Sequence, residues 1–375
     1  MHLQRLLLTQ YKNYDRQLIE CSSAFNCVVG KNGMGKTNLL DAIYYLCIGK
    51  SYFTPLDRYV VQHEQTFFRL EGYFSRNNKT EKIVAKVQPG KTKALERGDV
   101  VYAKLAEHVG LLPVVVIAPD DTSLVSEGSE SRRRFLDNTL SQLDPVYLKQ
   151  LMQYNKLLKQ RNALLKEFSK KGQVNLALIQ TYDDQMAGPA QAVYEKRQQL
   201  IQALTPKLEK YYQRISGAQE SVSCAYQSSL ADAPLSYLLG KAWEKDRALQ
   251  RTTVGIHRDE LLFQMEGSLI KRFGSQGQRK SFLFALKLAQ YEILAEQSGN
   301  SPILLLDDLF DKLDQDRVEQ LLSLLREEPF GQIFISDTDK ERMHEVMKRL
   351  AVNYRIFKVE AGLVDTLAED QATDE

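Results

Sequence analysis

Residues 30–37 have the composition of a loop that holds phosphate groups. The segment Gly30-Lys31-Asn32-Gly33-Met34-Gly35-Lys36-Thr37 matches GxxxxGK[ST], in which glycines let backbone N–H groups curl around phosphate oxygens. The N-terminus of the helix expected to follow adds partial positive charge. Lys36 would reach the β- and γ-phosphates of ATP and is a candidate catalytic residue. The Thr37 hydroxyl would bind Mg²⁺. These eight residues are our candidate ATP site.

An acidic segment supplies the second part of such a site. Residues 303–306 are expected to form a buried strand, which ends in Asp307 and Asp308. Asp307 would hold Mg²⁺ through water, whereas Asp308 points the other way and would orient or deprotonate the attacking water. A strand that simply ends in a polar turn is the alternative, and the phosphate loop makes it the weaker one.

A third segment becomes informative beside these two. Phe273-Gly274-Ser275-Gln276-Gly277-Gln278-Arg279-Lys280 places Ser275 and backbone amides at the start of a helix predicted over 278–297, which is another anion site. Alone, it would be an ordinary helix N-cap. Its position shortly before the acidic strand gives it more weight.

The order of elements predicts an α/β domain with a helical insertion. Residues 1–120 alternate like strands around one helix, residues 131–239 have long helical patterns, and the last third returns to α/β. We predict strands at 3–9, 25–29, 67–74, 82–88, 113–118, 303–306 and 332–336, and helices at 37–47, 278–297 and 315–326. Residues 1–120 and 246–360 would be two halves of one ATPase lobe, residues 121–245 a helical arm, and residues 361–375 an acidic tail.

Composition predicts a globular protein of a reducing compartment. The 375 residues are 43% hydrophobic and 26% charged, which suits two or three domains and excludes a disordered chain. The longest apolar run, 111–118, is too short to cross a bilayer, and the N-terminus lacks the pattern of a signal peptide. Four scattered cysteines form no CxxC pair. We therefore expect a cytoplasmic protein without a membrane partner.

Together the motifs resemble those of an ABC-type ATPase of the SMC branch. The resemblance rests on the phosphate loop, the Ser-x-Gly-Gln signature at Ser275, the Asp307-Asp308 pair and a D-loop at Lys312-Leu313-Asp314. Over residues 1 to about 360 the chain more closely resembles the RecF family, which adds the stretches 30–43, 131–137, 157–165 and 255–259. The expected fold is an α/β ABC-type (SMC-like) P-loop ATPase head with an inserted helical lobe.

This resemblance implies an ATP-dependent DNA clamp. In such proteins the signature serine of one subunit closes on the γ-phosphate held by the other, so Ser275, Gly277 and Gln278 would act in trans and Asp314 would lie at the subunit contact. It also implies ATP and Mg²⁺ as cofactors, an ATP-dependent homodimer, and binding to single-stranded and gapped duplex DNA. The implied partners are RecR and RecO, and the implied roles are loading of RecA, DNA repair, DNA replication and the SOS response.

Several positions depart from related patterns. ABC transporters carry glutamate where this chain has Asp308, and the shorter side chain suggests slow hydrolysis. The enzymatic activity to test is therefore a weak DNA-dependent ATPase activity, in which hydrolysis acts as a switch. The usual switch histidine is replaced by Ser336-Asp337-Thr338-Asp339, where a hydroxyl or carboxylate would sense the γ-phosphate. Phe53 and Ile256 stand where many relatives have arginine and proline, so we assign them no chemistry. We expect His257 to be structural.

The candidate DNA contacts are basic residues of the helical arm. Residues 149–171 contain seven Lys or Arg and one acid, although the net charge of the chain is only +2. Duplex binding of this class is mostly electrostatic. The candidates are Arg132, Arg133, Arg134, Lys156, Lys159 and Arg161. Pairing of these arginines with acids such as Asp137 is an equally weighted alternative.

Other functional classes fit the sequence less well. A transporter-type motor would carry the glutamate and the histidine that are replaced here. An SMC-like chromosome protein would need far longer coiled-coil arms than residues 131–239 provide. A generic P-loop kinase would lack the signature. An ABC-type ATPase subunit that does not act on DNA is the remaining alternative.

Overall fold

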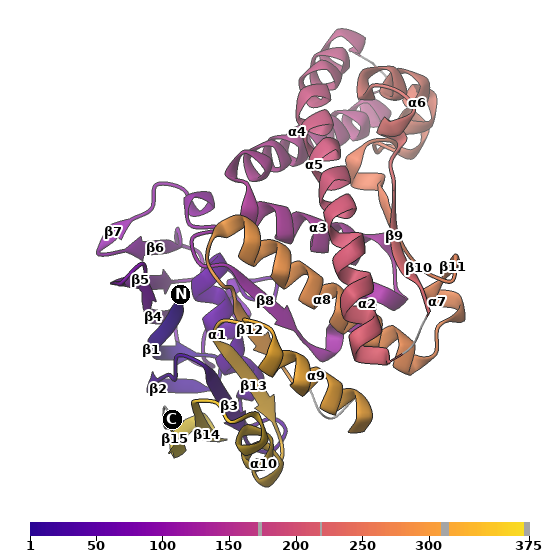
Figure 1. Ribbon diagram of the computed structural model, residues 1–375. Helices are drawn as coiled ribbons and strands as arrows, with labels where there is room; N and C mark the ends of the chain where they lie inside the picture. The colour runs from indigo at the N-terminus through magenta and orange to yellow at the C-terminus, as the bar shows by residue number, and fades with distance from the viewer. Residues whose placement is uncertain (172–174, 218–219, 309–314, 371–375) are drawn as a thin grey trace. The chain divides into compact units, whose positions relative to one another are not determined.

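Two six-stranded sheets make up most of the first of two units into which the chain divides (Figure 1). The computed structural model describes residues 1–171, 175–217, 220–308 and 315–370. Unit 1 comprises residues 1–121, 211–218 and 283–375, and unit 2 comprises residues 122–210 and 219–282. The insertion therefore extends to residue 282 instead of the predicted 245, and it includes the signature segment.

The sheet that carries the phosphate loop is parallel except at one edge. Its order is β15-β14-β3-β13-β12-β8, and only β15 runs antiparallel. The strands are β3 (Phe25–Val29), β8 (Val114–Ile117), β12 (Ile303–Leu306), β13 (Ile333–Asp337), β14 (Tyr354–Glu360) and β15 (Leu363–Asp370). Every residue of β3, β8, β12 and β13 is buried, as expected for parallel strands that are covered on both faces. Their carboxyl ends share one edge, which is where the phosphate loop and the Asp307-Asp308 pair begin.

The second sheet of unit 1 is antiparallel, in the order β2-β1-β4-β5-β6-β7. Its strands are β1 (His2–Tyr11), β2 (Tyr14–Glu20), β4 (Phe68–Arg76), β5 (Lys79–Val87), β6 (Ala94–Arg97) and β7 (Val100–Val101). Helix α1 (Lys36–Ile48) contacts strands of both sheets, and ten of its thirteen residues are buried. A helix that is apolar on most sides has to lie inside a core, and here it joins the two sheets into one hydrophobic cluster.

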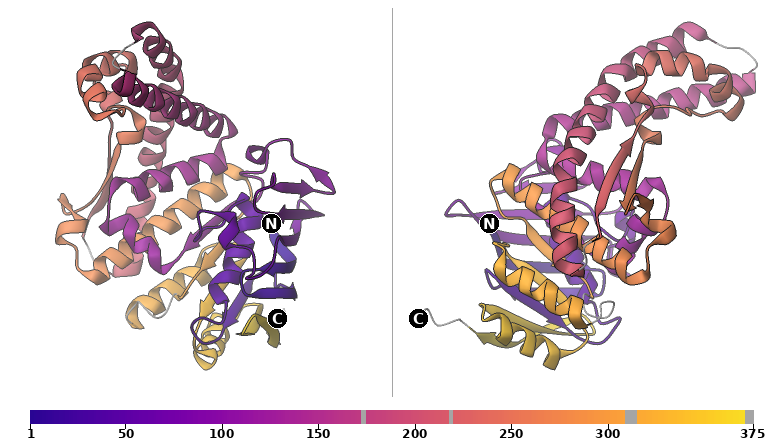
Figure 2. Two further views of the ribbon diagram at one scale, coloured as in Figure 1. Left: turned by 180° about the vertical axis from the view of Figure 1, so that it is seen from behind. Right: turned by 45° about the vertical axis from the view of Figure 1, so that its right-hand side comes forward.

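The other helices of unit 1 accompany the parallel sheet. They are α9 (Gln315–Glu327), α10 (Lys340–Leu350) and most of α8 (Gln276–Ser298). Helices α9 and α10 contact each other, and α10 also contacts β3 (Figure 2). The loops that follow the parallel strands lie at the carboxyl edge of this sheet.

The predicted acidic tail is partly a strand. Residues 363–370 form β15, which pairs with β14 through a two-residue turn at Ala361 and Gly362. Both turn residues have positive φ, +48° and +82°, which is the backbone of a tight hairpin turn. The negative charge of this segment therefore did not prevent it from extending the sheet.

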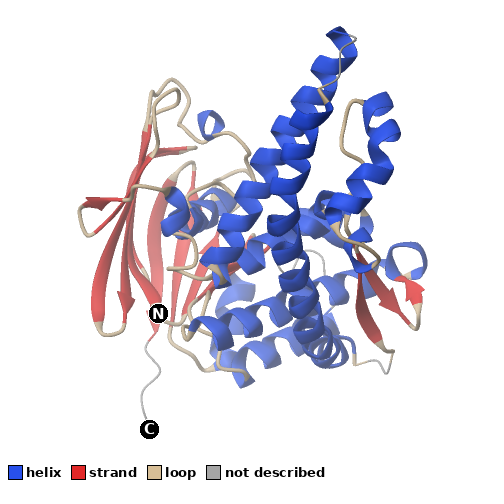
Figure 3. Cartoon of the chain, turned by 90° about the horizontal axis from the view of Figure 1, so that it is seen from above, coloured by secondary structure: helices blue, strands red, loops and turns tan. Residues whose placement is uncertain are grey.

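Unit 2 is mostly helical and contains the long rods α4 and α5 (Figure 3). Its helices are α2 (Thr122–Ser126), α3 (Ser129–Leu143), α4 (Pro145–Lys171), most of α5 (Leu176–Ser216), α6 (Leu235–Leu249) and α7 (Ile270–Phe273). A small antiparallel sheet has the order β11-β10-β9, with β9 at Val222–Gln227, β10 at Glu260–Met265 and β11 at Ser268–Leu269. Strand β9 corrects the prediction of helical segments throughout 131–239, because its pairing with β10 decides its conformation.

Along the described ranges, none of the helices combines the length and the apolar character needed to cross a bilayer.

Candidate functional site

The phosphate loop connects β3 to α1, as its sequence predicts. Gly35 is the N-cap residue of α1 and has a φ of +119°, a conformation that favours glycine. A Cβ on Gly35 would lie 2.4 Å from Asn13 Nδ2, and a Cβ on Gly30 would lie 2.3 Å from the carbonyl oxygen of Val359. Glycine is thus required at Gly30 by the close approach of the Val359 backbone, and it is favoured at Gly35 by the positive φ.

The turn between β1 and β2 holds the phosphate loop in place. Asn13 Nδ2 donates a hydrogen bond to the Met34 carbonyl at 2.9 Å, and Asn13 Oδ1 accepts one from Asn38 Nδ2 at 2.7 Å. The Tyr14 hydroxyl donates to the Gly35 carbonyl at 2.9 Å. Our sequence reasoning missed both residues, because a turn asparagine and tyrosine give no local sign of a contact with a loop 21 residues away.

Asp41 anchors α1 from inside the core. This fully buried carboxylate accepts hydrogen bonds from the Tyr11 hydroxyl at 2.9 Å, the Ser51 hydroxyl at 2.7 Å and the Tyr52 amide at 2.7 Å. Lys12 Nζ forms an ion pair with it at 2.7 Å. A carboxylate among the apolar residues of a buried helix was the signal that could have revealed this anchor.

Lys36 lies inside the curve of the phosphate loop. Its Nζ donates to the Gly30 carbonyl at 2.8 Å and to the Lys31 carbonyl at 3.3 Å, and it lies 3.4 Å from Asn32 Oδ1. The side chain is only 4% exposed, so its ammonium group is held by these acceptors and by the charge of Asp308 at 3.9 Å. The predicted phosphate-binding lysine is therefore buried at the centre of the loop.

Asp307 and Thr37 are 270 positions apart in the sequence, but their side chains are in contact. The Thr37 hydroxyl lies 2.8 Å from Asp307 Oδ2, and the Ser336 hydroxyl donates to Asp307 Oδ1 at 2.7 Å. Burial raises the pKa of the Asp307 carboxyl, while the Ser336 and Thr37 hydroxyls and the charge of Lys36 act to lower it. The structure thus brings the two predicted magnesium residues together.

Asp308 has an uncommon backbone conformation. Its φ is +44°, in the left-handed region that non-glycine residues rarely adopt, and its amide donates to the Ser336 hydroxyl at 2.8 Å. The Asp308 carboxylate lies 3.9 Å from Lys36 Nζ. The two carboxylates thus have different partners, since Asp307 contacts the Thr37 and Ser336 hydroxyls and Asp308 faces Lys36.

The segment 336–339, which stands in place of the switch histidine, contacts Asp307, the phosphate loop and α10. Ser336 bonds to Asp307, and the carbonyl oxygen of Asp337 accepts from the Gly30 amide at 3.2 Å. The Asp337 side chain instead receives Arg342 Nη2 at 2.5 Å, and Asp339 caps α10. Ser336 is therefore the residue of this segment whose side chain contacts the Asp307 carboxylate.

The chemistry of the donor set fits Mg²⁺. The Thr37 hydroxyl and the Asp307 carboxylate are hard oxygen ligands, which Mg²⁺ prefers, and they lie within hydrogen-bonding distance of each other. Among the described residues, no group of three or more His, Cys, Asp or Glu side chains could hold a metal alone.

The signature segment lies in unit 2, where it caps α8. The Ser275 amide donates to Gln278 Oε1 at 2.7 Å, and the Gln278 amide donates to the Ser275 hydroxyl oxygen at 3.1 Å. Ser275 is exposed, and Phe273 beside it is 75% exposed. Asp314 and the rest of the D-loop lie outside the described residues. Ser275 is thus exposed and hydrogen-bonded within the cap of α8.

Two of the candidate DNA contacts are wrong, because their side chains are buried. Arg161 is fully buried and donates to Asp183 at 2.6 Å and to Asp246 at 2.7 Å. Arg132 is 2% exposed and pairs with Glu260 at 2.8 Å. These two arginines hold unit 2 together from within.

The other basic candidates have more accessible side chains. Lys156 and Lys159 are exposed on α4, and Arg134 is exposed and pairs with Glu130 at 2.6 Å. Arg133 is half-buried and donates to the Asp259 carbonyl at 2.8 Å. The suggested acid Asp137 pairs instead with Arg197, at 2.8 Å. These four of the six residues therefore remain candidate DNA contacts.

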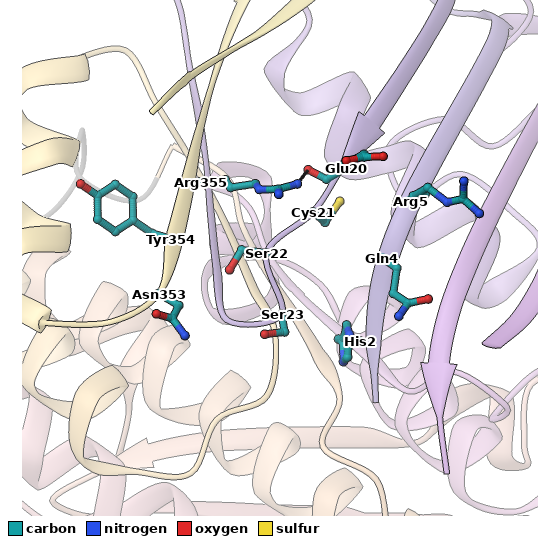
Figure 4. A pocket seen from close by; sticks show the side chains of 10 residues that line it. All are labelled: His2, Gln4, Arg5, Glu20, Cys21, Ser22, Ser23, Asn353, Tyr354 and Arg355. Carbon is teal, nitrogen blue, oxygen red and sulfur yellow. Dashed lines mark hydrogen bonds between the residues drawn. The ribbon is translucent and has the colours of Figure 1, made fainter. Parts of the chain in front are cut away.

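A separate polar pocket opens at the opposite edge of the parallel sheet (Figure 4). It has a volume of about 560 Å³ and lies near the first residues of β1, β3 and β14, away from the phosphate loop. Arg355 Nη1 donates to the Glu20 carbonyl at 2.7 Å across it. Because β3 separates this pocket from the phosphate loop, it takes no part in the nucleotide site.

Comparisons with known proteins identify relatives along nearly the whole chain. Residues 2–364 match the model of the RecF/RecN/SMC N terminal domain. The DNA replication and repair protein RecF of Flavobacterium johnsoniae is 45% identical over 96% of this chain and 100% of its own length. The RecF protein of Parabacteroides distasonis is 43% identical over 98% of this chain and 100% of its own length.

Solved structures agree with these relatives. A structure of the recombination mediator protein RecF with ATP, from the RecFOR pathway, has a TM-score of 0.88 at 28% identity and covers 98% of each chain. An Smc head bound to the C-winged helix domain of ScpA has a TM-score of 0.60 at 15% identity, covering 100% of this chain and 98% of its own. The second likeness supports the ABC-type head fold alone.

Proposed function

The chain belongs to the RecF family of DNA replication and repair proteins, and on that premise we propose that it is an ATP-dependent DNA clamp of recombinational repair. The observation that carries this proposal is the meeting of Lys36, Thr37, Asp307 and Asp308 at the carboxyl edge of the parallel sheet. Ligands of open α/β sheets bind at that edge.

The chain's own residues divide the work on ATP. The amides of residues 30–37 would surround the phosphates, and Lys36 would exchange its carbonyl acceptors for phosphate oxygens. Thr37 and Asp307 would hold Mg²⁺, which neutralises phosphate charge when bound. Asp308 would orient the attacking water, and its side chain, shorter than glutamate, supports slow hydrolysis that acts as a switch.

We propose that two copies close on ATP. The Ser275 hydroxyl, the Gly277 amide and Gln278 of one copy would meet the γ-phosphate held by the other, with Asp314 at the contact. The exposure of Phe273 beside Ser275 supports this, because burial of such a side chain would stabilise a dimer by about 2 kcal/mol. ATP binding would then assemble the clamp, and hydrolysis would release it.

The proposed DNA surface consists of Arg133, Arg134, Lys156 and Lys159. Its contacts would be with phosphates and would weaken steeply as salt rises. The relative solved as a recombination mediator in the RecFOR pathway supports RecR and RecO as partners, with RecA loading, replication restart and the SOS response as the setting. We place this activity at single-stranded and gapped duplex DNA in the cytoplasm.

Sedimentation velocity with gapped duplex DNA tests the proposal. The protein is compared with a Lys36→Arg variant, with and without ATP and Mg²⁺, at low and high salt. We expect ATP to produce a DNA-bound dimer in the wild type, and the variant to fail to form it or to form it without turnover. A protein that stays monomeric and off DNA at low salt with ATP present would favour the alternative, an ABC-type ATPase subunit that does not act on DNA.

A further inference from the structure

An acidic residue outside every motif contacts the signature segment. We propose that Glu220 positions Ser275 for its contact with ATP held by a second copy, by fixing the orientation of the Gln278 side-chain amide. Glu220 lies in the loop before β9, and it is 58 residues from Gln278 in the sequence. The inference rests on the proposed function, because the trans contact of Ser275 is its premise.

Three hydrogen bonds link the residues in series. Glu220 Oε1 accepts from Gln278 Nε2 at 2.8 Å, and Gln278 Oε1 accepts from the Ser275 amide at 2.7 Å. The Ser275 hydroxyl oxygen in turn accepts from the Gln278 amide at 3.1 Å. The last two bonds form a reciprocal capping box, in which each residue caps the backbone of the other. Glu220 extends this box by one charged acceptor.

The chemistry of an amide explains why the acceptor matters. A glutamine side chain presents oxygen on one side and NH₂ on the other, and the two differ little in shape. If the amide turned over, its NH₂ would face the Ser275 amide, and two donors would oppose each other. The Glu220 carboxylate can only accept, so it favours the orientation that leaves oxygen for Ser275. A charged acceptor also makes this bond stronger than a neutral one would.

The same contacts prepare the Ser275 hydroxyl for phosphate. Its oxygen already accepts from the Gln278 amide, which leaves the hydroxyl hydrogen to be donated. The group is exposed at the N-terminus of α8, a 23-residue helix whose partial positive charge favours an anion. An acceptor of negative charge that approaches from a second copy would therefore meet a donor that is already oriented.

Substitutions at Glu220 separate hydrogen bonding from charge. Glu220→Gln keeps an acceptor but loses the charge, Glu220→Ala loses both, and Glu220→Lys replaces the acceptor with a donor. We expect Glu220→Gln to dimerise with MgATP more weakly than the wild type but more tightly than Glu220→Ala, because its amide can still accept from Gln278 but can also donate and so no longer excludes the reversed orientation. For Glu220→Ala we expect the dimer dissociation constant to rise about 25-fold. Each of the two signature segments in the dimer would contribute a factor of about five, which is the typical effect of a lost helix-capping contact. Glu220→Lys should be weaker still, because it favours the reversed amide.

The readouts are sedimentation velocity with MgATP and titration of the monomer with a fluorescent ATP analogue. The second should be unchanged in all three variants, because the phosphate loop lies in unit 1. Glu244→Lys is the matched charge control, since Glu244 is an exposed acid of unit 2. Thermal unfolding followed by circular dichroism checks the fold, and the Gln and Ala variants alone decide the question if the Lys variant unfolds.

The possible results distinguish this inference from its premise. If the wild type dimerises with ATP, Ser275→Arg does not, and Glu220→Ala behaves like the wild type, the positioning role of Glu220 is overturned. A loss in Glu244→Lys equal to the loss in Glu220→Ala would also overturn it, since the charge of unit 2 and not amide orientation would be the cause. A wild type that never dimerises with ATP would instead refute the proposed function.

Discussion

Replacing Arg161 tests whether the basic arm residues were sorted correctly into structural and DNA-binding groups. Arg161→Met removes a guanidinium group that is fully buried between Asp183 and Asp246 and that also donates to Thr252 Oγ1 at 2.9 Å. Methionine has a similar length but cannot compensate the two carboxylates. Asp246 is itself fully buried, so its charge would be left without a cation in the core of unit 2.

The expected cost follows from that buried charge. Breaking a buried ion pair by removing one partner destabilises a protein by about 3–5 kcal/mol. For a unit of about 150 residues this lowers the melting temperature by roughly 10 °C. A second substitution, Asp246→Asn, removes the uncompensated charge, so the double variant should recover part of the loss.

Thermal unfolding and DNA affinity are measured together, with Lys159→Met as the matched control on the same helix. Lys159 is exposed, and its loss should leave the melting temperature unchanged while it weakens DNA binding and reduces the salt dependence. The reasoning would be refuted if Arg161→Met kept the wild-type melting temperature and lost DNA affinity, because Arg161 would then have to reach DNA.

Three further outcomes follow from the structure. Burial lowers the pKa of His257 from an ordinary 6.5 to about 4, so the unfolded chain binds the extra proton first and stability falls by up to about 3 kcal/mol as the pH drops from about 6.5 to about 4. Urea unfolding of His257→Gln at pH 7 and 4.5 should show a smaller fall, and an equal fall would exclude His257 as the cause. Phe273→Ser should raise the dissociation constant of the ATP-bound dimer about 1,000-fold, from about 30-fold for the roughly 2 kcal/mol lost at each of two symmetric contacts, without affecting ATP binding by the monomer; an unchanged dimer would contradict the proposed interface. Asn13→Ala should weaken ATP binding about tenfold in calorimetric titrations, since the Met34 carbonyl and Asn38 lose their partner, and unchanged affinity would show that the phosphate loop needs no brace.

Local sequence was sufficient where an element carries its own signal. The phosphate loop, the buried strand before Asp307 and the helix after Thr37 each have a pattern that neighbouring residues complete, and the structure has them as predicted. Strand β9 was missed because its pairing with β10 decides its conformation. Contacts such as Asn13 with Met34 join distant segments, so no local pattern announces them.

Arg161 was misjudged although its surroundings contained the answer. Tyr154, Leu157, Leu165 and Phe168 recur at helical spacing around it and are all buried, so Arg161 belongs to the apolar stripe of α4. Its charge suggested an exposed residue, whereas the periodicity indicated a buried one. The acids that neutralise it come from other helices, and only the fold brings them together.

A mixing experiment tests the central claim, that two copies share each ATP, most directly. Lys36→Ala disables the phosphate loop and Ser275→Arg disables the signature, so neither variant alone can build a complete site. An equimolar mixture with MgATP and gapped duplex DNA can build one complete site per heterodimer. We predict that sedimentation velocity shows a DNA-bound dimer in the mixture and in neither variant alone. Ser275→Arg that dimerises alone as well as the wild type, or a mixture that stays monomeric while the wild type dimerises, would contradict the account.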